Sequence, residues 1–224
     1  MAERRIGGNR RRIRGVRTAA LPVPWLAVGL LAATVLLTAL AAGDGVLPGD
    51  VAIATEVQEG DLPAAGALAD AAFVLGGTPL VTAVALGLTV GLLRARRGAE
   101  AWFLLAIVAT RAGNWLLKAI VDSPRPPASL VRVSEDASGL GFPSSHVLSA
   151  VLVYGSVIAL APFLVGPRPA RIALSVAAAV AIPVTGFGRI YTGAHWPSDV
   201  LGGYLWGALL LGALLWGYRR RIAA

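Results

Sequence analysis

The sequence predicts an all-α protein, a bundle of six helices that cross a membrane. Hydrophobic residues make up 56% of its 224 residues and charged residues only 14%. A soluble domain has about 25% charged residues, so this chain lacks the polar surface that water requires. Its apolar residues also gather into long runs, and about 20 apolar residues in a helix span a bilayer. The absence of cysteine excludes a disulfide scaffold and a zinc ribbon.

Six apolar runs define the expected spanning helices. The first run is too long for the apolar region of a cleavable signal peptide, so we expect it to span the membrane. The third run differs from the others because it contains Arg111 and Lys118. In chain order the runs are residues 21–43, 71–93, 101–121, 147–165, 172–188 and 200–218.

These runs divide the chain into a basic N-terminal segment at 1–20, a membrane domain at 21–218 and a basic tail at 219–224. Between the first two runs, residues 51–57 are expected to form a short amphipathic segment on the outer surface. That whole connection is acidic, with Asp44, Asp50, Glu56, Glu59 and Asp61.

Basic residues indicate the orientation of the bundle. Most of the 20 Lys and Arg residues precede the first run or follow the second, fourth and last runs. The positive-inside rule makes those segments, and with them both termini, cytoplasmic. We interpret the basic N-terminal segment as a signal for topology and for contact with anionic lipids, so no nucleic-acid partner is expected.

The other basic residues are candidates for function. A charge at membrane depth costs about 2.5–3.5 kcal/mol and is therefore rarely incidental. Snorkelling to the interface is an alternative explanation, but cations on the outer side are disfavoured unless an anion meets them. Lys118 is also the chain's single lysine, which indicates that a compact charge is needed there. The set comprises Arg111, Lys118, Arg125, Arg132 and Arg189.

Not all of these charges are assigned to a site. Arg111 lies in the middle of its run and is expected to pair inside the bundle. Arg132, Glu135 and Asp136 are expected to lie in a solvated loop. Asp122 receives no role.

One histidine, His146, follows Pro143, Ser144 and Ser145 at the start of the fourth run. Proline and serine are typical of a helix N-terminus. The free N–H groups of such a terminus also bind anions, so His146 would face an anion held there.

The other histidine, His195, precedes Asp199 by four residues. If a helix begins there, the two side chains share a face. A carboxylate that accepts a hydrogen bond from one imidazole nitrogen leaves the other nitrogen free to attack. Arg189 offers a planar group suited to phosphate oxygens.

In order and spacing, these motifs resemble the three-part signature of the type 2 phosphatidic acid phosphatase (PAP2) superfamily, whose helical core is shared with vanadium haloperoxidases. The resemblance implies that His195 is the nucleophile that carries the phosphoryl group, that Asp199 orients it, and that His146 is the general acid. It implies a phosphate-binding set of Lys118, Arg125, Ser144, Ser145 and Arg189.

Two residues depart from the family pattern. The family usually has glycine where this chain has Ser145, and serine where it has Gly188. We expect Ser145 to keep its backbone N–H while its side chain crowds the phosphate site. Gly188 loses a hydroxyl donor worth about 0.5–1.5 kcal/mol.

The resemblance implies a lipid phosphatase in the plasma membrane that acts at the outer face without a metal or other cofactor. Polyprenyl pyrophosphates such as the undecaprenyl or decaprenyl carrier are favoured by analogy with small bacterial members of the family. Phosphatidic acid and phosphatidylglycerol phosphate are alternative substrates. A lipid-linked phosphotransferase and a non-enzymatic lipid binder or translocator are alternative functions, although binding alone requires neither His195 nor Asp199.

Overall fold

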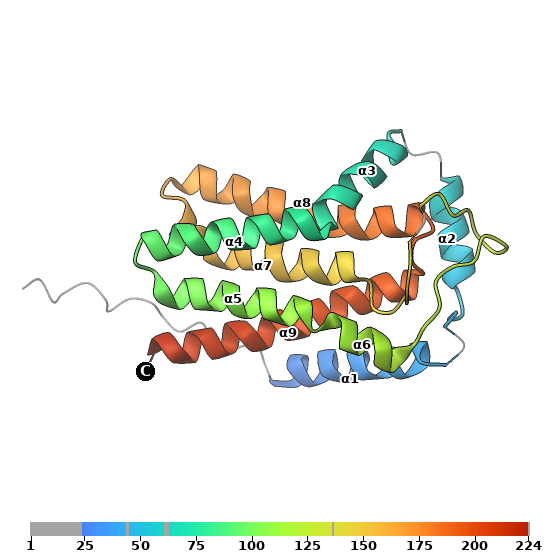
Figure 1. Cartoon of the computed structure of the whole chain (residues 1–224), viewed down its shortest axis with the longest axis horizontal. Helices are drawn as coiled ribbons and strands as arrows, with labels where there is room; N and C mark the ends of the chain where they lie inside the picture. Colours follow the sequence, from blue (N-terminus) through green and yellow to red (C-terminus); the bar gives the residue numbers. More distant parts are fainter. Residues whose placement is uncertain (1–23, 44, 61–62, 136, 224) are drawn as a thin grey trace, which may run out of the picture.

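The computed structural model describes residues 24–43, 45–60, 63–135 and 137–223 (Figure 1). The basic N-terminal segment and the first residues of the first apolar run lie outside these ranges. Within them the chain forms nine helices and no strand. The helices are α1 (Pro24–Ala41), α2 (Asp50–Glu59), α3 (Ala65–Gly76), α4 (Thr78–Arg94), α5 (Gly98–Ala112), α6 (Asn114–Val121), α7 (Ser145–Leu164), α8 (Arg168–Tyr191) and α9 (Pro197–Ala223).

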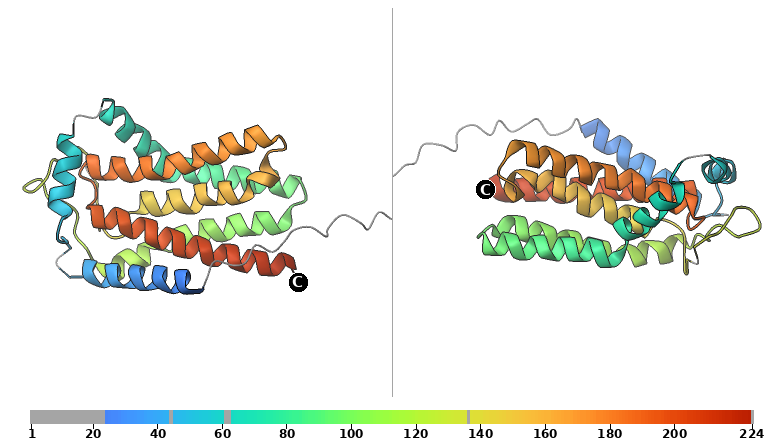
Figure 2. Two further views of the ribbon diagram at one scale, coloured as in Figure 1. Left: turned by 180° about the vertical axis from the view of Figure 1, so that it is seen from behind. Right: turned by 90° about the horizontal axis from the view of Figure 1, so that it is seen from above.

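The central helix of the bundle is α7. Its apolar stretch is 67% buried, against 17–22% for the other long apolar helices. It packs against α8, α9, α4 and α5 (Figure 2), and Leu148, Leu152 and Leu160 lie in its core contacts. The surrounding helices expose large apolar side chains such as Leu26 and Val176. An apolar outer surface of this kind suits contact with lipid.

In the described part of the chain, four helical segments are long and apolar enough to cross a membrane: Gly98–Val121, which joins α5 and α6, then α7, α8 and Pro197–Ile222 of α9. The fourth, fifth and sixth predicted runs therefore correspond to α7, α8 and α9. Two of these helices extend into the basic segments beside their runs. α8 includes the arginines that flank its apolar residues, and α9 includes the basic residues after 218.

The second predicted run, 71–93, is not one continuous helix. The structure divides this region between α3 and α4, which meet at an angle of 48° and together form a fifth candidate span. Gly77 at the break is extended (φ −64°, ψ 140°), and Pro79 in the first turn of α4 has no N–H to continue the helix from α3.

The first predicted run corresponds to α1. The apolar helix Trp25–Ala41 is about 25 Å long at 1.5 Å per residue, slightly less than the bilayer core of about 30 Å. Residues 21–23 of the run lie outside the described part of the chain.

The helix α2 lies across the ends of the long helices, beside the connection between α6 and α7 (Figure 1). It contains the predicted segment 51–57. We call this end of the bundle the site end. The α4–α5 turn, the α7–α8 turn and the C-terminus lie at the opposite end.

Candidate active site

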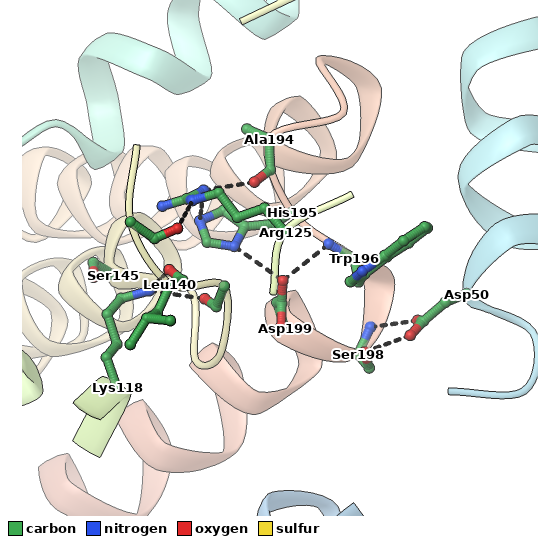
Figure 3. Close-up of polar contacts among 12 residues, drawn as sticks. Asp50, Lys118, Arg125, Leu140, Ser145, Ala194, His195, Trp196, Ser198 and Asp199 are labelled. Carbon is green, nitrogen blue, oxygen red and sulfur yellow. Dashed lines mark hydrogen bonds and ion pairs between the residues drawn. The ribbon is translucent and has the colours of Figure 1, made fainter. Parts of the chain in front are cut away.

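The residues predicted to act on phosphate come from distant parts of the chain and surround His195. Figure 3 shows Lys118, Arg125, Ser145, His195 and Asp199. Each stands at a helix end or in an adjoining loop. They are Lys118 in α6, Arg125 in the next connection, Ser144, Ser145 and His146 at the start of α7, Arg189 near the end of α8, and His195 and Asp199 around the start of α9.

His195 and Asp199 form the buried centre of the site. Their Nδ1 and Oδ2 atoms are 3.2 Å apart, and the two residues are 2% and 0% exposed. The pair is not held on one helical face, because α9 begins at Pro197 and His195 lies in the turn before it. Asp199 Oδ2 also accepts the N–H of Trp196 at 3.0 Å, as an acidic residue at the third helical position does. This second bond orients the carboxylate toward His195.

Arg125 decides which nitrogen of His195 carries the proton. Arginine has only donors, and its Nη1 lies 3.1 Å from His195 Nε2. Nε2 is therefore the acceptor, and the proton is on Nδ1, which donates to Asp199. Arg125 itself donates to the carbonyls of Ala194 at 2.6 Å and Gly139 at 2.9 Å. The Nε2 lone pair of the imidazole thus faces a cation and accepts a hydrogen bond from it.

The charge state of His195 follows from its surroundings. Burial lowers the pKa of the imidazole well below its ordinary value of 6.5, and the positive charges of Arg125, Lys118 and Arg189 lower this pKa further. The ring therefore remains neutral at neutral pH. Only the neutral ring has the lone pair that a nucleophile needs.

Lys118 holds the segment that precedes α7. Its Nζ donates to the carbonyl oxygens of Leu140 at 2.6 Å and Gly141 at 2.8 Å. Gly141 passes close to the His195–Asp199 pair, since a β carbon there would lie 2.8 Å from Asp199 Oδ2. A larger residue would displace either the segment or the carboxylate.

The start of α7 follows the predicted pattern. Ser144 precedes the helix, and its N–H donates to the Asp199 carbonyl at 3.0 Å. The buried Ser144 Oγ has no hydrogen-bond partner within the described residues. Such an atom is unusual unless a ligand or water completes it.

Ser145 forms a hydrogen bond with Asn114, a residue to which the sequence motifs give no role. Its Oγ accepts a hydrogen bond from Asn114 Nδ2 at 2.8 Å. The hydroxyl expected to crowd the phosphate site is therefore bonded to α6. Asn114 lies one helical turn before Lys118 in an otherwise apolar run. This spacing of two polar residues is the sequence signal that could have identified Asn114.

Arg189 is buried, 1% exposed, and paired with Glu135. Its Nη1 donates to Oε1 at 2.6 Å, and Nη2 lies 2.6 Å from Oε2. Glu135 lies in the predicted loop, but its side chain is only 21% exposed and is paired with Arg189 where solvation was expected, because the α6–α7 connection folds back over the end of α8. Carboxylate and phosphate groups both present two oxygens to a guanidinium. Glu135 therefore binds the Arg189 guanidinium, which was predicted to bind phosphate. Asp136 lies outside the described residues.

His146 is in the first turn of α7 and lies beside α3. Its ring centroid is 6.0 Å from that of Phe73, and Arg189 Cζ lies 5.6 Å from the same Phe73 ring. Phe73 therefore stands next to both side chains. Nothing in the sequence distinguishes Phe73 from the other apolar residues of its run.

Gly188 is a packing residue. A β carbon at this position would clash with Ala72 Cβ and lie 3.3 Å from Ala69 Cα. Both alanines are buried on α3. The usual serine would therefore not fit unless α3 moved.

The remaining charges have local roles. Arg111 pairs inside the bundle as expected, donating to Ser149 Oγ at 2.9 Å and Thr82 Oγ1 at 3.2 Å. Asp122 ends α6 with a left-handed backbone (φ 52°), a conformation that aspartate adopts more readily than most residues. Arg132 is exposed, with its Cζ 5.0 Å from the Tyr191 ring centroid.

Comparison with known proteins agrees with these motifs. The PAP2 superfamily model matches residues 99–223. The chain belongs to the PAP2 superfamily. This PAP2 protein is also similar to the crystal structure of a transmembrane PAP2 type phosphatidylglycerolphosphate phosphatase from Bacillus subtilis. The identity is 25% and the TM-score 0.68, over 88% of this chain and 96% of that one.

A comparison with curated proteins finds no significant match. The family and the structural match, together with the apolar helices, support a multi-pass membrane phosphatase of lipid phosphates.

Proposed function

We propose that this PAP2 protein hydrolyses a lipid phosphomonoester or pyrophosphate through a phosphohistidine formed at His195. The observation that carries the proposal is the chain of contacts from Arg125 to His195 to Asp199. It gives a neutral imidazole whose Nε2 lone pair faces a cation. The unpartnered Ser144 Oγ and Arg189 Nε supply further donors for an anion at this place.

In the first step, Arg125 Nη1 transfers its hydrogen bond from His195 Nε2 to a phosphate oxygen, and the released Nε2 lone pair attacks phosphorus while the bond from phosphorus to the leaving oxygen breaks. His146 gives its proton to that oxygen. Asp199 accepts from Nδ1–H and stabilises the positive charge that develops on the ring. In the second step, water attacks phosphorus and gives a proton to His146, the N–P bond breaks, and inorganic phosphate leaves.

The cations Lys118, Arg125 and Arg189 stabilise the negative charge on the transferred group, which is the main requirement of phosphoryl transfer. We propose that these three charges take the place of a metal ion. The described residues contain no group of three or more His, Asp or Glu side chains placed to bind one. Arg189 exchanges Glu135 for the substrate phosphate.

The bundle is proposed to span the plasma membrane six times, with α1 and the α3–α4 pair as the first two spans, both termini cytoplasmic and the site end outside. The arginine-rich turns at the end opposite the site support this topology. The chain has no cysteine, so single cysteines can be introduced without background. In whole cells a membrane-impermeant maleimide should label Ser129→Cys in the α6–α7 connection and leave Gly166→Cys unlabelled; the reverse pattern would invert the topology.

Phosphate release from a panel of lipids tests the activity. Phosphatidylglycerol phosphate comes first because the Bacillus subtilis protein is named for it, followed by polyprenyl pyrophosphate, polyprenyl phosphate and phosphatidic acid. Release should persist in EDTA and disappear in His195→Ala. Loss of activity in EDTA would contradict metal independence. Full activity in His195→Ala would show that His195 is not the nucleophile.

Trapping the phosphoenzyme intermediate distinguishes the proposed roles of the chain's two histidines. An acid-labile, base-stable phosphoenzyme should form in the wild type and in His146→Ala, more slowly in the latter, and be absent from His195→Ala. Transfer of the group to an added lipid or sugar alcohol, with no free phosphate, would instead identify a phosphotransferase.

A further inference from the structure

The helix α2 has a buried polar stripe that the proposed mechanism does not use. Asp50, Ala54 and Gln58 follow one another at intervals of four, so they share one helical face, and all three are buried. Buried carboxylate and amide groups are normally satisfied by specific partners. The partners of the Asp50 and Gln58 side chains lie in the elements that carry the active site.

Asp50 binds the start of α9 (Figure 3). Its Oδ1 accepts the backbone N–H of Ser198 at 2.8 Å, and its Oδ2 accepts the Ser198 hydroxyl at 2.6 Å. Oδ2 also accepts the N–H of Leu47 at 2.8 Å. The first N–H groups of a helix have no partner within it, so α2 caps α9 from 148 positions earlier in the sequence.

Ser198 lies between the two members of the catalytic pair. Asp199 is the next residue, and its Oδ2 receives both the Trp196 N–H and His195 Nδ1. By holding the backbone and the hydroxyl of Ser198, Asp50 fixes the turn from which the Asp199 carboxylate projects. Asp50 is 3% exposed and Ser198 6%, so water does not readily replace these bonds.

Gln58 keeps α2 attached at its other end. Its Nε2 donates to the carbonyls of Arg132 at 2.8 Å and Tyr191 at 3.2 Å. Its Oε1 accepts the Arg132 N–H at 3.0 Å. A change at Asp50 therefore removes the contact with α9 while this second attachment holds α2 in place.

We propose that Asp50 is a positioning residue for phosphoryl transfer: through Ser198 it holds Asp199 and His195 in the geometry of attack. The inference rests on the proposed function and assigns a role to a residue outside the segment that matches the PAP2 superfamily, residues 99–223. Asp50 does not touch the reacting groups, so its effect belongs to the chemical step and not to phosphate binding.

Asp50→Asn tests the proposal with little change in shape. Asparagine has one acceptor oxygen where aspartate has two, so its NH₂ group must face a donor now bound by Asp50. Because displacement of a catalytic group by about 1 Å can cost about a hundredfold in rate, we expect kcat to fall at least about tenfold. KM and inhibition by inorganic phosphate should stay within about twofold of the wild type, since the cations reside on other elements.

Two further variants complete the test. Ser198→Ala keeps the N–H contact and loses only the hydroxyl, so its effect should be smaller. The double variant Asp50→Asn with Ser198→Ala should be no worse than Asp50→Asn alone, because the two residues act through one contact. Glu56→Gln removes a carboxylate from the exposed side of α2 and should retain wild-type activity.

An unchanged kcat in Asp50→Asn would overturn the positioning role. So would a weakening of phosphate binding as large as the loss of kcat, which would show general disruption of the site. A wild type inactive on the whole panel would contradict the proposed function instead. The role of Asp50 would then be decided by NMR of ¹⁵N-histidine protein: the His195 Nδ1 proton signal should move in Asp50→Asn and not in Glu56→Gln, and an unmoved signal would overturn it.

Discussion

Replacing Gly188 by the serine usual in the family should harm this protein. The added β carbon would clash with Ala72 Cβ on α3 and lie 3.3 Å from both the Cα and the carbonyl oxygen of Ala69. The neighbouring atoms are backbone or a side chain with no rotatable bond, so α3 itself would have to move. Displacing α3 also moves Phe73, which stands beside His146 and Arg189.

The size of the effect follows from overpacking. Extra carbons in a packed core cost about 1–3 kcal/mol, and 1 kcal/mol shifts Tm by about 2–4 °C in a domain of about 150–250 residues. Gly188→Ser should therefore lower Tm by about 2–12 °C in detergent, with a loss of kcat and no gain from the restored hydroxyl.

Ala72→Gly provides the matched control. Alone it should destabilise by about 0.5–1 kcal/mol, the usual cost of glycine within a helix. Combined with Gly188→Ser it removes the clashing β carbon, so the double variant should be more stable than the sum of the single effects predicts. Additive effects, or a Gly188→Ser protein as stable as the wild type and more active, would refute the packing explanation and favour the lost donor.

Three other residues allow sharp tests. Lys118→Arg should lower kcat/KM at least about tenfold, because a planar guanidinium cannot reproduce the two bonds to the Leu140 and Gly141 carbonyls and one charged hydrogen bond is worth about 1.5–3 kcal/mol; wild-type kinetics would make the lysine incidental. Glu135→Gln leaves the buried Arg189 without its counter-charge, so the variant should unfold at a lower temperature than the wild type. Added inorganic phosphate should raise the unfolding temperature of the variant more than that of the wild type. Equal increases would show that phosphate does not replace Glu135. Since the pKa of His195 is held well below 6.5, the acid limb of the kcat/KM profile should fall below pH 6.5, and a limb above that value would contradict a buried neutral nucleophile. As pH falls, His195 is protonated in the unfolded chain at a higher pH than in the folded protein, so the free energy of unfolding should decrease as pH falls through 6.5.

Much of the site was predictable because its residues belong to short motifs. Lys118, Arg125, His146, Arg189 and His195 stood out as charged or titratable groups in or beside apolar runs. The structure gathers them around His195 at one end of the bundle. Details within the motifs were less predictable. The contact of His195 with Asp199 is made from a turn into a helix start, where the sequence suggested a shared helical face.

Composition and local pattern by themselves determined the class of this protein. Low charge and long apolar runs are properties of neighbouring residues, and they indicated a helical membrane protein before any packing was known. The ordered motifs added the resemblance to the PAP2 superfamily. The bend at Gly77, the pairing of Arg189 with Glu135 54 residues away and the cap that Asp50 places on α9 were decided only by the tertiary structure. Each depends on which helix ends meet, and that is set by the packing of distant segments and not by the residues on either side of them.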